Sequence, residues 1–173
     1  ESADLPESFD GYKIVQISDV HSGTFDSLAK VKKGIDLINV QRAHLVLFTG
    51  DMVNNLASEI EPFMDLFASL KAEHGVFSIL GNHDYGDYVM WPSKEMKAAN
   101  LQRLKDLQRE MGWDLLLNEH RYIQKGEDQL AIIGVENWGK GFGQKGDLAA
   151  AVDGCLAETK LLLSHDPTHW DEV

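Results

Sequence analysis

Short apolar runs alternate with longer amphipathic segments along most of this 173-residue chain. The apolar runs predict strands over residues 13–18, 45–48, 76–80, 114–117 and 161–163. Apolar residues that recur every three or four positions predict helices over residues 28–38, 60–70 and 96–111, the last with Ser93 as its N-cap. A hairpin is predicted from residues 122–124 and 130–135, followed by a glycine-rich loop over 139–146 and a helix over 147–155. This alternation is typical of an α/β fold.

Length and composition predict one soluble globular domain over residues 1–173. Chains of ~100–200 residues usually form one domain, and no repeat or linker divides this one. Apolar residues make up 43% of the chain and charged residues 25%, which argues against a disordered or disulfide-rich protein. The single cysteine, Cys155, cannot form an internal disulfide. No apolar run approaches the ~20 residues that a membrane span needs.

The net charge of the chain is −12, from 16 basic and 28 acidic residues. An acidic surface repels the phosphate backbone of nucleic acids, and the sequence has no run of five or more lysines and arginines that would offset this repulsion. The sequence therefore predicts that nucleic acids are not partners of this protein.

Four polar clusters stand directly after predicted strands. They are Asp19-Val20-His21, Gly50-Asp51, Gly81-Asn82-His83-Asp84 and His165-Asp166. Ligands of open α/β sheets bind beyond the carboxyl ends of the strands, so these four ends are expected to converge. Carboxylate, imidazole and amide donors together suit Mn, Fe or Zn better than Ca. Each cluster alone has an ordinary structural explanation, but the four in this order predict a metal site.

The spacing within two of the clusters adds expectations about geometry. In Asp19-Val20-His21, an extended backbone would place both functional side chains on one side, where they could hold one ion. Gly50 and Gly81 are expected to let the backbone turn sharply, so that the polar side chains after them point inward.

The order Asp-x-His, Gly-Asp, Gly-Asn-His-Asp and then His resembles that of the calcineurin-like metallophosphoesterase superfamily over nearly the whole chain. The resemblance implies the α/β/β/α sandwich of that family and a centre of two divalent metal ions. By the same resemblance, Asp19 and His21 would hold the first ion, Asp51 would bridge both ions, and Asn82 and His165 would hold the second.

The resemblance also implies a hydrolase that cleaves a phosphoester, phosphodiester or pyrophosphate bond by a metal-activated hydroxide. Two ions about 4 Å apart can hold the attacking and leaving oxygens, and a bound water becomes hydroxide near neutral pH. The metals expected are Mn, Fe or Zn. His83 would face the leaving group and would be oriented by Asp84. Tyr85 and Trp138 are candidate substrate-binding residues, because one follows a strand-end cluster and the other follows a later strand.

The segments Gly-Asn-His-Asp-Tyr and Ser-His-Asp-Pro resemble bacterial members of the family that are often linked to membranes. Some of those members are pyrophosphatases that act on UDP-diacylglucosamine and related lipid intermediates. This resemblance implies a phosphorylated small molecule or a lipid-linked substrate, and a parent protein associated with a membrane.

The family pattern closes with Gly-His-x-His, and this sequence has no such motif after His165. His169 is not preceded by glycine, so we do not assign it to that motif. We therefore expect a fold that is incomplete at its C-terminus, with the motif located beyond Val173 in a longer parent. A sheet face left uncovered in this way would promote self-association.

Two other functions are alternatives to that of a phosphohydrolase. A signalling receiver domain needs an acidic pair after its first strand and a lysine after its last, whereas here those strands lead to Asp19-Val20-His21 and to His165. A metal-binding scaffold that has kept the fold and lost the activity is the remaining alternative. The presence of both His83 and Asp84 favours the enzyme over that scaffold.

Overall fold

The protein was analysed as a computed structural model, which describes residues 5–140 and 143–173. Gly141 and Phe142, in the glycine-rich loop predicted over 139–146, lie outside the described residues. In the part of the chain that is described, no helix combines the length and the apolar character needed to cross a membrane.

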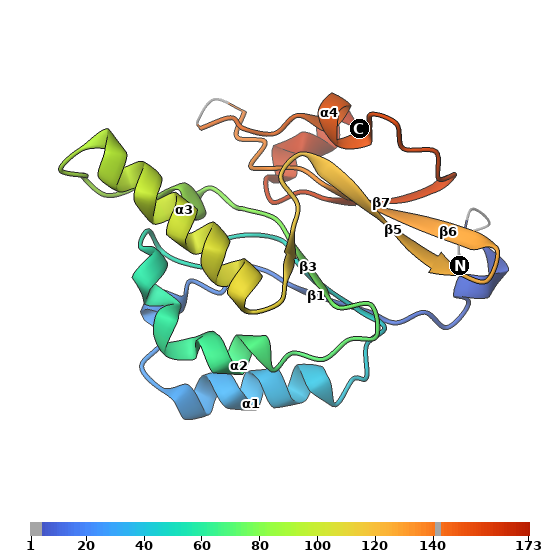
Figure 1. Ribbon diagram of the computed structural model, residues 1–173, viewed down its shortest axis with the longest axis horizontal. Coiled ribbons are helices and arrows are strands. Elements are labelled where there is room, and N and C mark those ends of the chain that lie inside the picture. Colours follow the sequence, from blue (N-terminus) through green and yellow to red (C-terminus); the bar gives the residue numbers. More distant parts are fainter. Residues whose placement is uncertain (1–4, 141–142) are drawn as a thin grey trace.

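The first half of the chain forms a parallel sheet with helices on one face. Its strands are β1 (Ile14–Ile17), β2 (Leu45–Phe48), β3 (Val76–Ser78) and β4 (Asp114–Leu115), which lie side by side in that order. The connecting helices are α1 (Leu28–Asn39), α2 (Met64–Ala68) and α3 (Lys94–Glu110). All three helices lie on the same side of the sheet (Figure 1).

A second sheet covers the other face of the first. It consists of β5 (Glu119–Lys125), β6 (Asp128–Gly134) and β7 (Thr159–Leu163), in the order β5-β6-β7. Strands β5 and β6 form an antiparallel hairpin, whereas β7 pairs with β6 in parallel. The short helix α4 (Leu148–Val152) packs on the outer face of this sheet (Figure 1).

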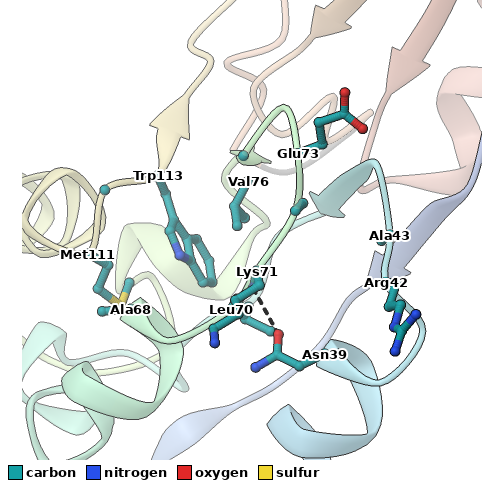
Figure 2. A pocket seen from close by; sticks show the side chains of 13 residues that line it. Asn39, Arg42, Ala43, Ala68, Leu70, Lys71, Glu73, Val76, Met111 and Trp113 are labelled. Carbon is teal, nitrogen blue, oxygen red and sulfur yellow. Dashed lines mark hydrogen bonds between the residues drawn. The ribbon is translucent and has the colours of Figure 1, made fainter.

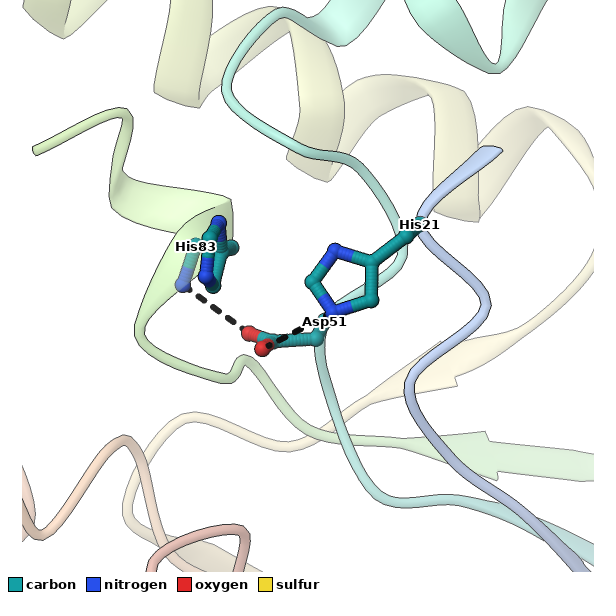
Figure 3. A group of neighbouring side chains, drawn as sticks. All are labelled: His21, Asp51 and His83. Carbon is teal, nitrogen blue, oxygen red and sulfur yellow. Dashed lines mark hydrogen bonds and ion pairs between the residues drawn. The ribbon is translucent and has the colours of Figure 1, made fainter. Parts of the chain in front are cut away.

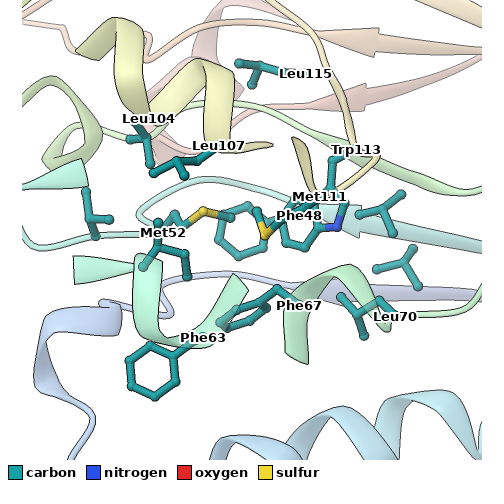
Figure 4. Packing of buried hydrophobic residues seen from close by; sticks show 14 of the residues in the cluster. Phe48, Met52, Phe63, Phe67, Leu70, Leu104, Leu107, Met111, Trp113 and Leu115 are labelled. Atoms are coloured by element: carbon teal, nitrogen blue, oxygen red, sulfur yellow. The ribbon is translucent and has the colours of Figure 1, made fainter. Parts of the chain in front are cut away.

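Alternation along β2 explains how the layers hold together. All four of its residues are buried. Val46 and Phe48 pack among the helices, where Phe48 meets Trp113 (Figure 4). Leu45 and Leu47 point to the opposite face, into a second apolar cluster shared with the strands of the second sheet. The layers therefore run helices, sheet, sheet, helix, which confirms the predicted α/β/β/α sandwich.

Two predicted elements differ from the observed ones. The helix predicted over residues 60–70 is a 3₁₀ turn at Glu61–Phe63 followed by the short helix α2, because the backbone of Phe63 leaves helical geometry, with a φ of −112° and a ψ of 2°. The hairpin strands are longer than predicted, since only Ile123 of β5 is buried and the apolar signal there is weak. Ser93 is the N-cap of α3 as predicted: its hydroxyl accepts from the Met96 N–H at 3.3 Å.

Candidate metal centre

The ends of four strands bring the predicted metal-binding side chains together. Asp19 and His21 follow β1, Asp51 follows β2, Asn82 follows β3 and His165 follows β7. Backbone pairing continues past the first two strands, because the N–H groups of Asp19 and His21 donate to the carbonyls of Gly50 and Asp51, both at 3.0 Å. Strand β7 belongs to the second sheet, so His165 approaches from that side.

The backbone is strained at three of these residues. The φ angles of Asp19, His21 and Asp51 are 55°, 45° and 59°. These values lie in the left-handed region, which residues other than glycine rarely adopt. The prediction of an extended Asp19-Val20-His21 segment is therefore wrong, and the two side chains are brought together by turns instead. Strain of this kind persists only where surrounding contacts impose it, and it is concentrated at functional sites.

Gly50 and Gly81 provide the space in which Asp51 sits. Gly50 has a φ of 98°, so the sharp turn predicted there is confirmed. Gly81 has another role: a Cβ at this position would lie 2.2 Å from Oδ1 of Asp51 and 2.6 Å from its backbone nitrogen. Glycine is required at position 81 because two chain segments approach closely there.

The carboxylate of Asp51 lies at the middle of the group. Its Oδ2 is 3.6 Å from Nε2 of His21 and 3.3 Å from Nε2 of His165, while its Oδ1 accepts the His83 N–H at 2.9 Å. Figure 3 shows this carboxylate between the rings of His21 and His83. Asp51 is only 2% exposed, so these neighbours replace water around its charge.

Two overlapping sets of ligand atoms share Asp51. One set is His21, Asp51 and His83, and the other is Asp19, Asp51 and His165, with the ligand atoms of each set within 4.8 Å of one another. Asn82 joins the second set, because its Oδ1 is 3.0 Å from Nε2 of His165. Asp19 also lies near His21, the residue with which it was grouped in the prediction: its Oδ1 is 4.0 Å from Nε2 of His21.

Each of the three histidine rings is fixed by its Nδ1 atom. Nδ1 of His21 is 3.1 Å from Oδ1 of Asn54, Nδ1 of His83 is 2.8 Å from the carbonyl oxygen of Asn54, and Nδ1 of His165 is 2.8 Å from the carbonyl oxygen of Thr49. Since these oxygens only accept, each Nδ1 donates its proton, and Nε2 of the neutral ring keeps its lone pair. Metal-binding histidines are oriented in this way.

The chemistry of the group fits a bound cation. The Nε2 lone pairs of His21 and His165 point at carboxylate and amide oxygens, so acceptors face acceptors unless a proton or a metal ion lies between them. Burial on its own would lower the pKa of His165, but the hydrogen bond and charge of Asp51 outweigh it and raise that pKa to about 9. Burial would raise the pKa of Asp51, yet His165 holds it below its usual value.

Asp84 supports the backbone and does not contact the ring of His83 in the way predicted. Its Oδ2 accepts from the N–H groups of Asp51 and Gly81 at 2.9 Å, and its Oδ1 accepts from those of Met52 and Val53 at 2.8 and 3.2 Å. The prediction that Asp84 orients His83 is wrong, because that ring is bonded to Asn54 instead. Burial and the charge of Asp51 raise the pKa of Asp84 to about 7, although the backbone donors oppose that rise.

The two predicted substrate-binding residues lie away from the metal ligands. Tyr85 is only 5% exposed, and its hydroxyl donates to Oε1 of Glu136 at 2.8 Å. Trp138 stacks on His169, with 4.0 Å between ring centroids, and packs beside α4. His169 is itself buried and belongs to neither set of ligand atoms.

Tyr88 is an aromatic residue that contacts the centre. Its ring stacks on His83 with centroids 4.4 Å apart, and its hydroxyl accepts from Nδ2 of Asn82 at 2.6 Å. Tyr88, Asn82 and Asn137 line a cavity of about 460 Å³ beside the ligand set. Sequence reasoning missed Asn54, because an isolated asparagine in a loop carries no pattern that would single it out.

A further cavity of about 530 Å³ lies near the amino-terminal ends of β2 and β3, at the opposite edge of the sheet. Asn39, Leu70, Val76 and Trp113 are among the residues that line it (Figure 2). None of the predicted site residues lines this cavity. It is therefore separate from the candidate metal centre.

Comparison with known proteins agrees with the geometry. The sequence model of the calcineurin-like phosphoesterase family matches residues 12–172. The chain belongs to this family. The resemblance found in the sequence is thus confirmed, and the two facing sheets with outer helices are the family's fold. The family hydrolyses phosphoester bonds and depends on metal ions.

Three relatives illustrate the range of similar proteins. The uncharacterized metallophosphoesterase YkuE of Bacillus subtilis is 38% identical over 101 residues, which are 57% of this chain and 35% of that protein. A transmembrane protein with metallophosphoesterase domain from Danio rerio is 25% identical over 171 residues, 94% of this chain and 37% of that protein. The UDP-2,3-diacylglucosamine pyrophosphatase LpxG of Chlamydia trachomatis is 39% identical over 89 residues, 49% of this chain and 27% of that protein. The matched segments thus span about a third of the length of these relatives.

Proposed function

We propose that this protein is a phosphohydrolase with a centre of two divalent metal ions. Asp19, His21, Asp51, Asn82 and His165 would hold the ions, with Asp51 shared between them. The orientation of the imidazoles of His21 and His165 carries the proposal. Their Nδ1 atoms are hydrogen-bonded to carbonyl oxygens. Their Nε2 atoms lie within 3.6 Å of the Asp51 carboxylate. We also propose that residues 1–173 form a single catalytic domain.

Ions bound there would neutralise phosphate charge and lower the pKa of a water molecule, so that hydroxide forms near neutral pH. The buried carboxylate of Asp51 fixes the position of both sets of ligand atoms, because its Oδ1 is held by the His83 N–H. Asn54 and Thr49 keep the three rings in orientations that expose Nε2. The chain thus pre-organises the ligands before substrate binds.

His83 is proposed to act on the leaving oxygen. Because its Nδ1 donates to the carbonyl of Asn54, its Nε2 carries a proton only when the ring is an imidazolium. His83 would therefore donate from Nε2 in its charged form, while its Nδ1 donates to the Asn54 carbonyl. Tyr88 stacks on this ring and limits its rotation. In this proposal Asp84 contributes only by holding the backbone on which Asp51 stands.

The substrate class is proposed from the family and its members. The bond cleaved would be a phosphoester, phosphodiester or pyrophosphate bond, and the pyrophosphatase among the relatives supports the last of these. A phosphorylated small molecule or a lipid-linked phosphate would be the substrate. Mn, Fe or Zn would be the metal, since a mixed set of oxygen and nitrogen donors suits these ions.

Asp51→Asn tests this function directly. In the presence of Mn²⁺ the native protein should hydrolyse bis(p-nitrophenyl) phosphate, and Asp51→Asn should abolish turnover because it removes the shared charge. Asp36→Asn, at an exposed carboxylate on α1, serves as the matched control and should keep full activity. Activity of Asp51→Asn within tenfold of the native protein would contradict the proposal. A native protein that binds metal and shows no turnover would be the non-catalytic scaffold.

A further inference from the structure

A second cavity adjoins the one beside the candidate metal centre. Its volume is about 320 Å³, and it shares Asp87 and Gly143 with the cavity lined by Asn82 and Tyr88. The two cavities therefore lie next to each other. We call this space the lysine cavity, because Lys94, Lys97 and Lys145 line it.

The lysine cavity is unusual for a protein of this charge. The chain has a net charge of −12 and 16 basic residues, yet three of those residues line one cavity. Lys97 is paired with Asp87. Across the described ranges, no carboxylate lies within ion-pair distance of the ammonium groups of Lys94 and Lys145. Two positive charges are therefore available to a ligand.

The position of two of these lysines in α3 is also unfavourable to the helix itself. Lys94 and Lys97 lie in its first turn, where the partial positive charge of the helix end disfavours cations. Ala98 and Leu101 follow on the same face and line the same cavity. Lys97 gains its ion pair with Asp87 in return. Lys94 has no ion-pair partner among the described residues, so its place at this helix end breaks a local rule without such a gain and favours a functional cause.

Asp87, which lines the lysine cavity, and Glu136, which contacts the lining residue Tyr85, already have partners. Asp87 pairs with Lys97. Glu136, next to Tyr85, accepts from the Tyr85 hydroxyl at 2.8 Å and from Nδ2 of Asn118 at 3.0 Å. Neither carboxylate neutralises Lys94 or Lys145. The buried ring of Tyr85 forms part of the wall, which gives the cavity an apolar surface beneath a positive rim.

We propose that the lysine cavity binds a second phosphate group of the substrate, while the phosphate to be cleaved lies at the metal centre. The inference rests on the proposed function and narrows its substrate class to organic phosphates that carry two phosphate groups. Lys94 and Lys145 would bind the second group as point charges. Lys97, held by Asp87, would complete the positive field around it.

The first test measures binding without turnover. Inorganic phosphate is titrated into the metal-free protein and followed by the amide resonances of residues 94, 98 and 145. We expect saturable shifts there, and an apparent dissociation constant that rises about fivefold or more in the double variant Lys94→Ala/Lys145→Ala. The control Lys33→Ala/Lys105→Ala removes the same charge from lysines outside the cavity and should leave the constant within twofold of native.

The second test measures selectivity. Glucose 1-phosphate and glucose 1,6-bisphosphate compete with bis(p-nitrophenyl) phosphate in the Mn²⁺-loaded protein. We expect the native protein and the control to bind the bisphosphate at least fivefold more tightly. The Lys94→Ala/Lys145→Ala variant should lose that preference, with kcat for bis(p-nitrophenyl) phosphate unchanged.

The two tests separate this inference from the proposed function. Absence of turnover in the native protein would refute the function and leave the phosphate titration as an independent result. Equal phosphate affinity in the lysine variant and in the native protein would overturn the lysine cavity as a phosphate site, whatever the turnover. Phosphate shifts confined to the residues around Asp51 and His165 would overturn it too.

Discussion

At the scale of single residues, the candidate centre depends on residues that lie outside the two sets of ligand atoms. Asn54 fixes two histidine rings, one through its side chain and one through its carbonyl. Asp84 gathers four backbone N–H groups onto one buried carboxylate, and so holds Asp51 in its strained conformation. Both residues act by positioning others.

Asp84→Asn should lower the free energy of unfolding by about 2–4 kcal/mol at pH 8, because an amide NH₂ would then face buried N–H donors. Urea unfolding measures this, with an unchanged m-value showing that the native state remains compact. Asp36→Asn, at an exposed carboxylate, is the control and should change stability by less than about 0.5 kcal/mol. Equal stability of the two variants would show that Asp84 is not a support.

Asn54→Ala should weaken Mn²⁺ binding about tenfold, since it removes the oxygen that orients His21. Isothermal titration calorimetry gives the dissociation constant. Asn39→Ala is a suitable control, because its side chain bonds to backbone groups of Ser69 and Lys71, far from the centre. An unchanged dissociation constant in Asn54→Ala would show that the ring of His21 needs no such support.

The sequence predicted which residues meet but not how they are arranged. Asp51 and its partners were found because metal-binding side chains follow strands in a characteristic order. Tyr88 could not be preferred over Tyr85, since both follow the same cluster and only packing buries Tyr85 against Glu136. The grouping of Asp19 with His165 depends on left-handed backbone turns at Asp19 and His21. The sequence of that segment contains no glycine that would predict such turns.

At the scale of elements, the ends of β1, β2 and β3 must approach closely to form the centre. Gly81 allows this approach, because any side chain there would collide with Asp51. Strand β7 adds His165 from the second sheet, so that the centre lies where the two sheets meet. The pairing of the sheets therefore contributes directly to the ligand set.

Gly81→Ala should destabilise the protein and weaken metal binding, because the new Cβ would lie 2.2 Å from Oδ1 of Asp51. Gly34→Ala gives a matched contrast. Its Cβ meets nothing within 4 Å on α1, so it should raise the free energy of unfolding by up to about 1 kcal/mol. Thermal unfolding of both variants, with and without Mn²⁺, measures the difference. A stable Gly81→Ala that binds metal normally would refute the close approach.

Elements with clear periodicity were predicted well, whereas those shaped by tertiary contacts were not. The run of apolar residues predicted the position of β2, and the N-cap serine predicted where α3 begins. The segment around Pro62 has helical spacing, but the non-helical backbone of Phe63 divides it into a 3₁₀ turn and the short helix α2. That β7 pairs with the hairpin, rather than with the first sheet, depends on long-range contacts that a local pattern does not contain.

At the scale of the whole molecule, one apolar cluster joins the two sheets. Leu45, Leu47 and Phe77 of the first sheet meet Ile123 and Ile132 of the second. Because the ligands come from both sheets, separation of the layers would take His165 away from Asp51. Stability and metal binding should therefore be coupled through this cluster.

Ile132→Ala tests the coupling. Ile132 is fully buried between the sheets, so the change should cost about 2–5 kcal/mol while unfolding remains a single transition. The control Val40→Ala, at a side chain that is 67% exposed, should stay within about 0.5 kcal/mol of native. Two separate transitions by calorimetry would show that residues 1–173 do not fold as one domain.

The number of divalent ions bound per chain tests the central claim most directly. Equilibrium dialysis against Mn²⁺ or Zn²⁺, followed by metal analysis, should give two ions per chain for the native protein. Asp51→Asn should bind fewer ions, and more weakly, because Asp51 belongs to both sets of ligand atoms. A native protein that binds no ion, or an Asp51→Asn variant that binds two as tightly, would contradict the account.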